Sequence, residues 1–544
     1  MRPAIGLGVA LLVVLAGCSV PLADGPTTDT ATESPTTTPM TPVEQSEGTG
    51  TDGGEQSSGD SEESTDGTDD EQSTGDTDGE QSTGNASEMV ETLADPAEDR
   101  LGWEAGLWYN ETIDVDNSDG MNETERTLAV ARAMARVEHV RQLEFPGNDT
   151  IPISVISRAE FQERGFGNTS YSDAYRTFDN VKFEALFFVG EDTDSLAEQE
   201  SNQGASVLGY YSPSNDSIVL ISEGDLPTFD GEETLAQEVA HALQDQLFDI
   251  AELRRSVETR DGFNGQNGVI EGDGNLIDEL YVQECESNWS CIPAPNGSSS
   301  SSDIGSDFNW GIYFMEFLPY SDGPGFIEYY YDRGGWDRID EMYQDPPQSS
   351  EQVIFPAKYE SDPPENVTLA DETAGTWERV RPEPQRPDGV QPHYDTLGMA
   401  SLSSMFMATN YDDYNSSALV SPFEFLNFDD SGNVDSSDPI NYTLTWTDGW
   451  EGDRLQIYQN DAGENGYVWR LEWENATDAQ QFARNYQQLV SHWGGSQVSE
   501  GRWVVTDSSP YADAFDVTVE GETVTIVNAP TVDQLSDVYT PVAS

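Results

Sequence analysis

The stretch Thr234-Leu-Ala-Gln-Glu-Val-Ala-His-Ala-Leu-Gln-Asp-Gln246 decides how the middle of this chain folds. Apolar residues recur there at helical spacing, at Leu235, Val239, Leu243 and Leu247, which predicts a helix with one apolar face. The simplest interpretation of this pattern is a plain amphipathic helix whose leucine and valine stripe is buried.

The polar residues of the same helix indicate a second interpretation. Two histidines at positions i and i+4, with a glutamate directly after the first, bind zinc on the helices of many hydrolases. Here Glu238 and His241 hold the glutamate and second-histidine positions, whereas Gln237 holds the first. A neutral amide oxygen is a weaker zinc ligand than an imidazole nitrogen. The stretch therefore combines the scaffold of a metal site with one degenerate position.

A third zinc ligand in such hydrolases comes from a glutamate on a later helix. The candidate is Glu271, in Val269-Ile-Glu-Gly-Asp-Gly274. Asp273 and Asp278 lie nearby in the sequence and are candidates to orient the ligands. His393, in a proline-rich segment, is a candidate substitute ligand.

Further stretches in the same order carry a family resemblance: Arg141-Gln-Leu-Glu-Phe145, Val207-Leu-Gly-Tyr-Tyr211, Val269-Ile-Glu-Gly272, Gly334-Gly335 and Pro346-Pro-Gln-Ser-Ser-Glu-Gln-Val-Ile-Phe-Pro-Ala-Lys-Tyr359. Residues from about 120 to 360 thereby resemble the zinc-metallopeptidase-like (gluzincin) domains of bacterial and haloarchaeal surface lipoproteins. The resemblance implies that His241 and Glu271 are metal ligands and that Glu238 is the general base. The chain departs from the family pattern at Gln237 and at Phe355, where the family often has histidines.

The chain is very acidic, with 23 Lys and Arg against 103 Asp and Glu and a formal net charge of −80. The acid is spread along the whole sequence instead of forming one tail. In molar salt the Debye length falls to about 3 Å, so the repulsion among these charges is screened. We interpret the composition as adaptation to a hypersaline environment, which suggests a halophilic archaeal source, and expect no nucleic-acid partner.

The N-terminus predicts a targeting segment. Arg2 precedes an apolar run over residues 4–16, which is too short for a convincing membrane span. Leu15-Ala16-Gly17-Cys18 looks like a lipobox, so we predict a lipoprotein signal peptide over residues 1–17 and lipidation of Cys18. An uncleaved anchor is the alternative, and either would tether the protein to the extracellular face of the membrane.

The composition predicts the following domain organisation. Residues 18–88 contain the lipidated cysteine and a disordered acidic Thr/Ser/Gly linker, which has nothing to bury. We expect a metallopeptidase-like domain over residues 89–360 and a C-terminal α+β domain over residues 361–544, because so long a chain rarely folds around one core. The predicted fold class is α+β, with a mixed sheet and active-site helices in the first domain and a smaller α+β domain after it.

Residue periodicity predicts individual helices and strands. Helices are expected at 128–145, 158–164, 233–248, 267–283, 324–333, 338–343, 396–407 and 478–493. Strands are expected at 151–156, 183–189, 206–211, 217–221, 452–458, 467–473, 503–506 and 523–528.

Two cysteines follow Cys18, at Cys285 and Cys291. In an exported protein this pair predicts a disulfide. Asn-x-Ser/Thr sequons recur along the chain, among them Asn110 and Asn475, and predict a glycoprotein.

Three functional hypotheses remain open from the sequence. The first is a cell-surface lipoprotein whose metallopeptidase-like domain has lost catalysis and binds a peptide, an envelope polymer or a neighbouring envelope protein, without a cofactor. The second is an active metal-dependent hydrolase that uses His241, Glu271 and a substitute ligand on zinc, with Glu238 as base. A purely structural envelope component, with no cleft, is a third hypothesis.

Overall fold

The computed structural model describes residues 96–540, apart from residues 148, 166–170, 223, 225, 230, 258, 296–307, 385–391, 413, 416 and 430. The chain is 43% helical and 16% strand, which confirms the predicted α+β class. The predicted signal peptide, Cys18 and the predicted linker lie outside the described residues. Within the described part, no helix is long and apolar enough to cross a membrane.

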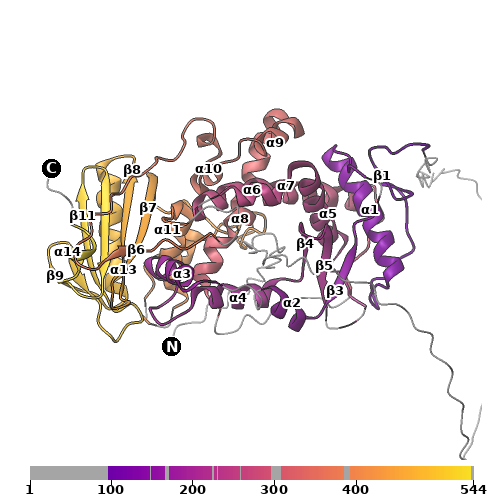
Figure 1. The fold of residues 1–544 in the computed structure, drawn as a ribbon. Helices are drawn as coiled ribbons and strands as arrows, with labels where there is room; N and C mark the ends of the chain where they lie inside the picture. The colour runs from indigo at the N-terminus through magenta and orange to yellow at the C-terminus, as the bar shows by residue number, and fades with distance from the viewer. Residues whose placement is uncertain are drawn as a thin grey trace, which may run out of the picture. The chain divides into compact units, whose positions relative to one another are not determined.

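The described chain begins with a short hairpin and a long helix (Figure 1). β1 (Trp103–Glu104) pairs with β2 (Leu107–Trp108), and α1 (Glu123–Arg141) follows. Asn122 accepts hydrogen bonds from the first backbone N–H groups of α1, and the Glu125 side chain accepts from the Asn122 N–H at 2.9 Å. This capping box explains why the helix begins here.

A three-stranded sheet comes next. β3 (Ile153–Ile156) lies parallel to β5 (Ser217–Ile221), and β4 (Gly209–Ser212) lies antiparallel to β5 on its other side. The connection from β3 to β4 contains α2 (Arg158–Gly165), α3 (Asp173–Ala185) and α4 (Ser195–Ser206). Because β4 is an edge strand, its free edge is open to contact with α5 (Glu232–Phe248), which packs beside it (Figure 1).

A series of helices follows α5, of which two, α7 and α8, are long. They are α6 (Ile250–Arg255), α7 (Arg260–Ser287), α8 (Trp310–Gly334), α9 (Trp336–Met342), α10 (Ser350–Ile354) and the 3-10 helix η2 (Pro356–Lys358). α7 and α8 pack very closely, since a Cβ on Gly272 would lie 2.3 Å from the carbonyl oxygen of Gly323. Glycine is therefore required at the position directly after Glu271.

The C-terminal region is built on an antiparallel sheet of order β6-β7-β8-β12-β11-β10-β9. Its strands are β6 (Glu378–Arg379), β7 (Trp450–Gln459), β8 (Asn465–Trp473), β9 (Ser496–Ser499), β10 (Arg502–Val504), β11 (Ala514–Glu520) and β12 (Thr523–Ala529). α13 (Ala476–His492) packs against β8, β11 and β12 (Figure 1). Its predicted apolar stripe, Phe482, Tyr486 and Leu489, is fully buried there.

The remaining C-terminal elements connect or extend this sheet. They are α11 (Gly398–Met407), the 3-10 helix η3 (Ala408–Asn410), α12 (Pro422–Phe425) and α14 (Leu535–Val538). α11 was predicted from residue 396, and the structure starts it two residues later, at a glycine with φ 77°.

One hydrophobic core contains residues from both predicted domains. It includes Phe187 and Ile312 from before residue 360, and Trp469 and Phe515 from after it. The ring centroids of Phe187 and Phe515 are 6.0 Å apart. The described residues on the two sides of the predicted boundary therefore share apolar packing.

Both lysines of the chain also connect these two parts. The Lys182 ammonium lies 2.8 Å from Asp179 and 3.5 Å from Asp395. The Lys358 ammonium lies 2.8 Å from Glu351, 3.1 Å from Asp362 and 2.9 Å from Glu474. Lys182 thus has one carboxylate partner beyond residue 360, and Lys358 has two.

Two predictions of secondary structure were wrong. Residues 183–189 are not a strand: Phe183 lies in the last turn of α3, which ends at Ala185, and a turn with Phe187 at φ 58° follows. A short apolar run is buried in either structure, so periodicity cannot separate the two. The helix predicted at 324–333 is the end of α8, which starts at Trp310. The prediction placed Pro324 in the first turn of the helix, but both Pro319 and Pro324 lie inside α8.

Candidate functional site

The helix α5 is buried on every side through its middle. Leu235 to Gln244 are all buried, whereas Leu247, at the end of the predicted apolar stripe, is 37% exposed. The polar residues Gln237, Glu238 and His241 are 8%, 3% and 0% exposed. The leucine and valine stripe predicted for an amphipathic helix is therefore buried as far as Leu243, and the polar residues of the same helix are buried with it.

The structure brings together the imidazole and the carboxylate that the sequence analysis selected. His241 Nε2 on α5 lies 3.4 Å from Glu271 Oε2 on α7, and both side chains are fully buried. Two ligand atoms of a tetrahedral zinc ion, each roughly 2.0–2.1 Å from the metal, lie about 3.4 Å apart. The separation of these two atoms thus equals that of two ligands on one zinc ion.

The orientation of the His241 ring is fixed from its other side. His241 Nδ1 lies 2.8 Å from Gln244 Oε1. The Gln244 amide nitrogen donates to the Ile270 carbonyl oxygen at 3.0 Å and to Asp273 Oδ2 at 3.3 Å. Since the Gln244 amide nitrogen is turned toward these two acceptors, the Gln244 amide oxygen faces His241. An amide oxygen can only accept a hydrogen bond, so His241 Nδ1 must carry the proton that it donates. His241 Nε2 is then the nitrogen that faces Glu271.

Asp273 supports this arrangement through Gln244. Its carboxylate also pairs with the Arg141 guanidinium at 2.9 Å and accepts from the Tyr343 hydroxyl at 2.7 Å. Asp273 thus orients His241 through an intermediate amide, as metal sites commonly use carboxylates. No described contact joins Asp278 to His241 or Glu271. Burial, together with the negative charge of Glu233, raises the pKa of Asp278 to about 8.

Glu271 has a cationic neighbour that the sequence did not reveal. Arg254, from α6, places Nη2 3.4 Å from Glu271 Oε1, while its Nε donates to Asn267 at 3.0 Å. The carboxylate of Glu271 therefore lies between a guanidinium and an imidazole. Within the described residues, Glu271 Oε2 is buried and makes no hydrogen bond.

Glu238 faces the edge strand β4. Its Oε2 accepts the Tyr211 backbone N–H at 2.6 Å. Burial raises the pKa of Glu238 to about 7, although His241 and the Tyr211 N–H lower it in part. A carboxyl that titrates near neutrality is suited to accept and return a proton.

A pocket of about 230 Å³ adjoins Glu238. β4, β5 and the start of α5 line it, mostly with apolar side chains such as Leu208, Ile218, Phe229 and Leu235. Glu238 is the acidic residue in its lining. The pocket is thus an apolar cavity with a carboxyl group at one side.

The other predicted site residues lie as follows. Gln237 is one turn before His241 on α5, and no described contact joins its side chain to His241 or Glu271. The ring of His393 packs on Tyr394, with centroids 4.9 Å apart. The Cys285–Cys291 disulfide forms as predicted.

Two atoms here, His241 Nε2 and Glu271 Oε2, are spaced like ligands of one zinc ion. Gln237 stands where the zinc-binding motif has its first histidine. Two groups of three acidic ligands occur in the described part, and neither includes His241 or Glu271: they are Glu184, Glu191 and Asp513, and Asp362, Glu451 and Glu474. Arg254 also places a positive charge on the carboxylate that a zinc ion would need. The residues present do not complete a catalytic zinc site.

Sequence reasoning missed Arg254 and Gln244. Gln244 had a usable signal, because a residue three positions after His241 lies on the same helix face. Arg254 had none, since its contact with Glu271 depends on how α6 packs on α7.

Comparison with known proteins adds one finding. Residues 384–539 match a family described as Domain of unknown function (DUF8575). This match covers most of the predicted C-terminal domain and none of the residues around His241. No curated protein matches the chain, and no solved structure does.

Proposed function

We propose that this protein is a lipid-anchored cell-surface protein with a degenerate, non-catalytic zinc-metallopeptidase-like domain that binds a ligand beside the former catalytic helix. The gluzincin-like character of residues 89–360 is part of this proposal. It rests on the pairing of His241 with Glu271 across α5 and α7.

One observation favours loss of catalysis: Glu271 is shared between His241 and Arg254. A guanidinium supplies to this carboxylate the positive charge that a metal ion would otherwise provide. Gln237 supplies no charge and binds zinc weakly. The His241–Glu271 pair can therefore persist in the folded protein without a metal ion.

The pocket beside Glu238 favours a peptide as the ligand. Its apolar lining suits an aliphatic side chain, and the Glu238 carboxyl suits a hydrogen-bond donor next to it. We expect Thr234→Trp, which fills the pocket, to abolish binding of a fluorescent peptide rich in leucine and lysine. Thr127→Trp, on the exposed face of α1, is the matched control and should leave binding unchanged. Equal binding by both variants would remove the pocket from the proposal.

Metal analysis tests the loss of catalysis. The full chain, purified in molar salt and equilibrated with zinc, should retain much less than one zinc per chain and should not digest unfolded casein. Stoichiometric zinc together with proteolysis that a chelator stops would favour the active hydrolase instead.

The variant Gln237→His tests the geometry of the site. Restoring the imidazole should raise zinc affinity by more than the roughly 10–100-fold that a supporting residue contributes. Gln246→His adds a histidine to the exposed side of the same helix and should bind no more zinc than the parent. If Gln237→His behaves like Gln246→His, the site is misplaced.

The active metal-dependent hydrolase is the second candidate. This candidate is favoured by the pKa of Glu238. Burial raises this pKa to about 7, a value that suits a general base. The zinc and casein experiment separates this candidate from the first.

Anchoring at the extracellular face of the membrane is the remaining part of the proposal. It is supported by the lipobox that ends at Cys18 and by the sequence of the linker. Cys18→Ser should release the protein from the membrane fraction in the native host. Retention of Cys18→Ser in that fraction would favour the uncleaved anchor.

A further inference from the structure

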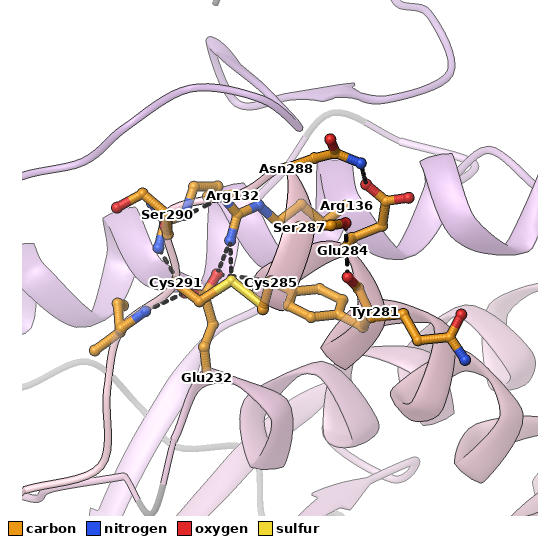
Figure 2. The surroundings of a disulfide bond; sticks show 12 residues. Arg132, Arg136, Glu232, Tyr281, Glu284, Cys285, Ser287, Asn288, Ser290 and Cys291 are labelled. Atoms are coloured by element: carbon orange, nitrogen blue, oxygen red, sulfur yellow. Dashed lines mark hydrogen bonds and ion pairs between the residues drawn. A yellow bond between two sulfur atoms is a disulfide. The ribbon is translucent and has the colours of Figure 1, made fainter. Parts of the chain in front are cut away.

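The disulfide between Cys285 and Cys291 lies at the end of α7 (Figure 2). Cys285 is in the last turn of the helix, and Cys291 is in the segment that follows it. Both cysteine residues are partly exposed. The two sulfur atoms have different electrostatic surroundings.

A guanidinium contacts only one member of this pair in the contacts that the structure describes. Arg136 Nη1 lies 3.3 Å from Cys291 Sγ, and Arg136 Nη2 donates to the Ser290 carbonyl oxygen at 3.3 Å (Figure 2). A cation at this distance stabilises a thiolate on Cys291.

Cys285 is in a negative environment. Glu284 and Glu286 flank it in the sequence. It also lies at the C-terminal end of α7, where the helix dipole places partial negative charge. A thiolate on Cys285 is therefore disfavoured relative to one on Cys291.

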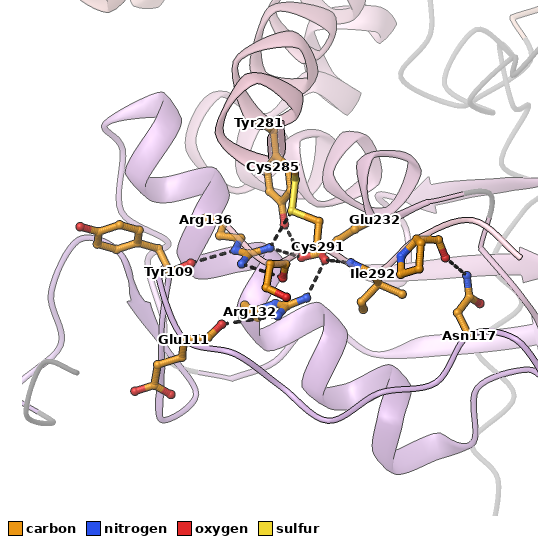
Figure 3. Close-up of polar contacts among 12 residues, drawn as sticks. Tyr109, Glu111, Asn117, Arg132, Arg136, Glu232, Tyr281, Cys285, Cys291 and Ile292 are labelled. Carbon is orange, nitrogen blue, oxygen red and sulfur yellow. Dashed lines mark hydrogen bonds and ion pairs between the residues drawn. A yellow bond between two sulfur atoms is a disulfide. The ribbon is translucent and has the colours of Figure 1, made fainter. Parts of the chain in front are cut away.

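The charge beside Cys291 is not fully balanced within its own cluster (Figure 3). Arg132 and Arg136 both pair with Glu232, at 2.6 and 2.7 Å, and all three side chains are at most 1% exposed. The other hydrogen bonds to this carboxylate come from neutral donors, the Tyr281 hydroxyl and the Ile292 N–H. Two guanidiniums and one carboxylate leave one positive charge, which a Cys291 thiolate would neutralise.

We propose that this disulfide is a thiol-exchange site with a fixed direction, in which an external thiolate attacks Cys285 and Cys291 is the leaving group. The attacking thiolate forms a new bond to Cys285 Sγ as the Cys285–Cys291 bond breaks. The electron pair of the broken bond stays on Cys291, which leaves as a thiolate beside Arg136. The ligand class is a low-molecular-weight thiol or the reactive dithiol of a protein reductant. Exchange is faster when the departing thiolate is the more stable one.

This exchange would reach the helix that carries Glu238 and His241. Ile292, next to Cys291, donates to the Glu232 side chain at 2.7 Å and accepts from the Glu232 N–H at 3.2 Å. Glu232 is the first residue of α5. Opening the disulfide removes the covalent link that holds this segment at the start of the helix.

Peptide mapping of a glutathione reaction tests the direction. The oxidised full chain is mixed with reduced glutathione in molar salt, quenched in acid before reduction is complete, and digested at low pH. Mass spectrometry then quantifies glutathione on each cysteine peptide, and the Cys18 peptide is resolved separately. We expect glutathione on Cys285 to exceed that on Cys291 by about tenfold. Equal amounts, or an excess on Cys291, would overturn the proposal.

Two substitutions test whether Arg136 sets the direction. Arg136→Lys keeps the charge and should keep the preference for Cys285, whereas Arg136→Gln should bring the two cysteines close to parity. An unchanged preference in Arg136→Gln would refute the role of this guanidinium. If Arg136→Gln does not fold, Glu286→Gln provides the second measurement: removing this exposed negative charge should reduce the preference, and an increase would count against the proposal.

Discussion

The buried carboxylate of Glu232 offers the sharpest test of what holds α5 in place. It accepts four hydrogen bonds, from Arg132, Arg136, Tyr281 and Ile292, at 2.6 to 2.7 Å. Glu232→Gln keeps the shape of the side chain and removes its charge. Two buried guanidiniums then lose their shared counter-charge.

The expected cost follows from this burial. Removing one partner of a buried ion pair destabilises a protein by about 3–5 kcal/mol. The free energies of four separate hydrogen bonds to a charged group would add up to more than this. The glutamine oxygen still accepts some of these hydrogen bonds, so we expect a loss of stability of about 3–5 kcal/mol. A folded unit this large has a transition entropy of about 0.9 kcal/mol/K, so the fall in Tm should be roughly 3–5 °C.

Urea unfolding and thermal melting at one fixed molar salt concentration measure this effect. Urea is preferable to guanidinium chloride, which would itself screen charges. Glu252→Gln is the matched control, because Glu252 pairs with Arg255 at 3.0 Å on the surface, where such a pair contributes about 1 kcal/mol or less. If Glu232→Gln costs no more than Glu252→Gln, the network does not hold the helix as we argue.

Three further predictions concern packing, pH and charge. Gly272→Ala should lower the free energy of unfolding, measured with urea, by about 1–3 kcal/mol, because the new Cβ would lie 2.3 Å from the Gly323 carbonyl oxygen. Gly325→Ala is the control on the same helix pair and should not destabilise the protein, because no atom lies within 4 Å of a Cβ at that position. Burial raises the pKa of Asp261 to about 8, so between about pH 4 and pH 8 the folded state holds a proton that the unfolded state has released. The stabilisation from this proton is complete below about pH 4 and should be lost as the pH rises to about 8. Tm should therefore fall less steeply with pH in Asp261→Asn than in the parent protein, and an unchanged slope would contradict this. Lys358→Met should destabilise the folded protein by about 1–3 kcal/mol in thermal melts, because Glu351, Asp362 and Glu474 lose their common cation. Lys358→Arg keeps the charge and should cost less. Equal losses of stability in the two variants would mean that the charge is not the cause.

The sequence predicted those elements whose periodicity is determined locally. The helix predicted at 233–248 is α5 (Glu232–Phe248), and that predicted at 478–493 is α13 (Ala476–His492). β11 (Ala514–Glu520) was missed, although strands were predicted at the positions of its partners β10 and β12. α8 was shortened in the prediction because prolines usually mark helix starts, whereas here the surrounding core holds the helix together around them.

The candidate site was predicted in part. His241 was selected from the motif spacing within one helix, whereas Glu271 was selected by analogy with hydrolases that take a third ligand from a later helix, since no spacing rule joins residues on two separate helices. Burial of α5 on both faces and the approach of Arg254 to Glu271 depend on tertiary packing. No pattern within the sequence encodes either of them.

The two lysines give this protein an unusual chemical property. Each ammonium lies among carboxylates, and each lysine side chain is at most 22% exposed. Each ammonium also reaches a carboxylate beyond position 360. Acylating reagents therefore have no freely accessible lysine to modify in the described part of the native fold. The rate at which such a reagent acylates Lys182 and Lys358 would report directly on separation of the C-terminal sheet from the helices before it.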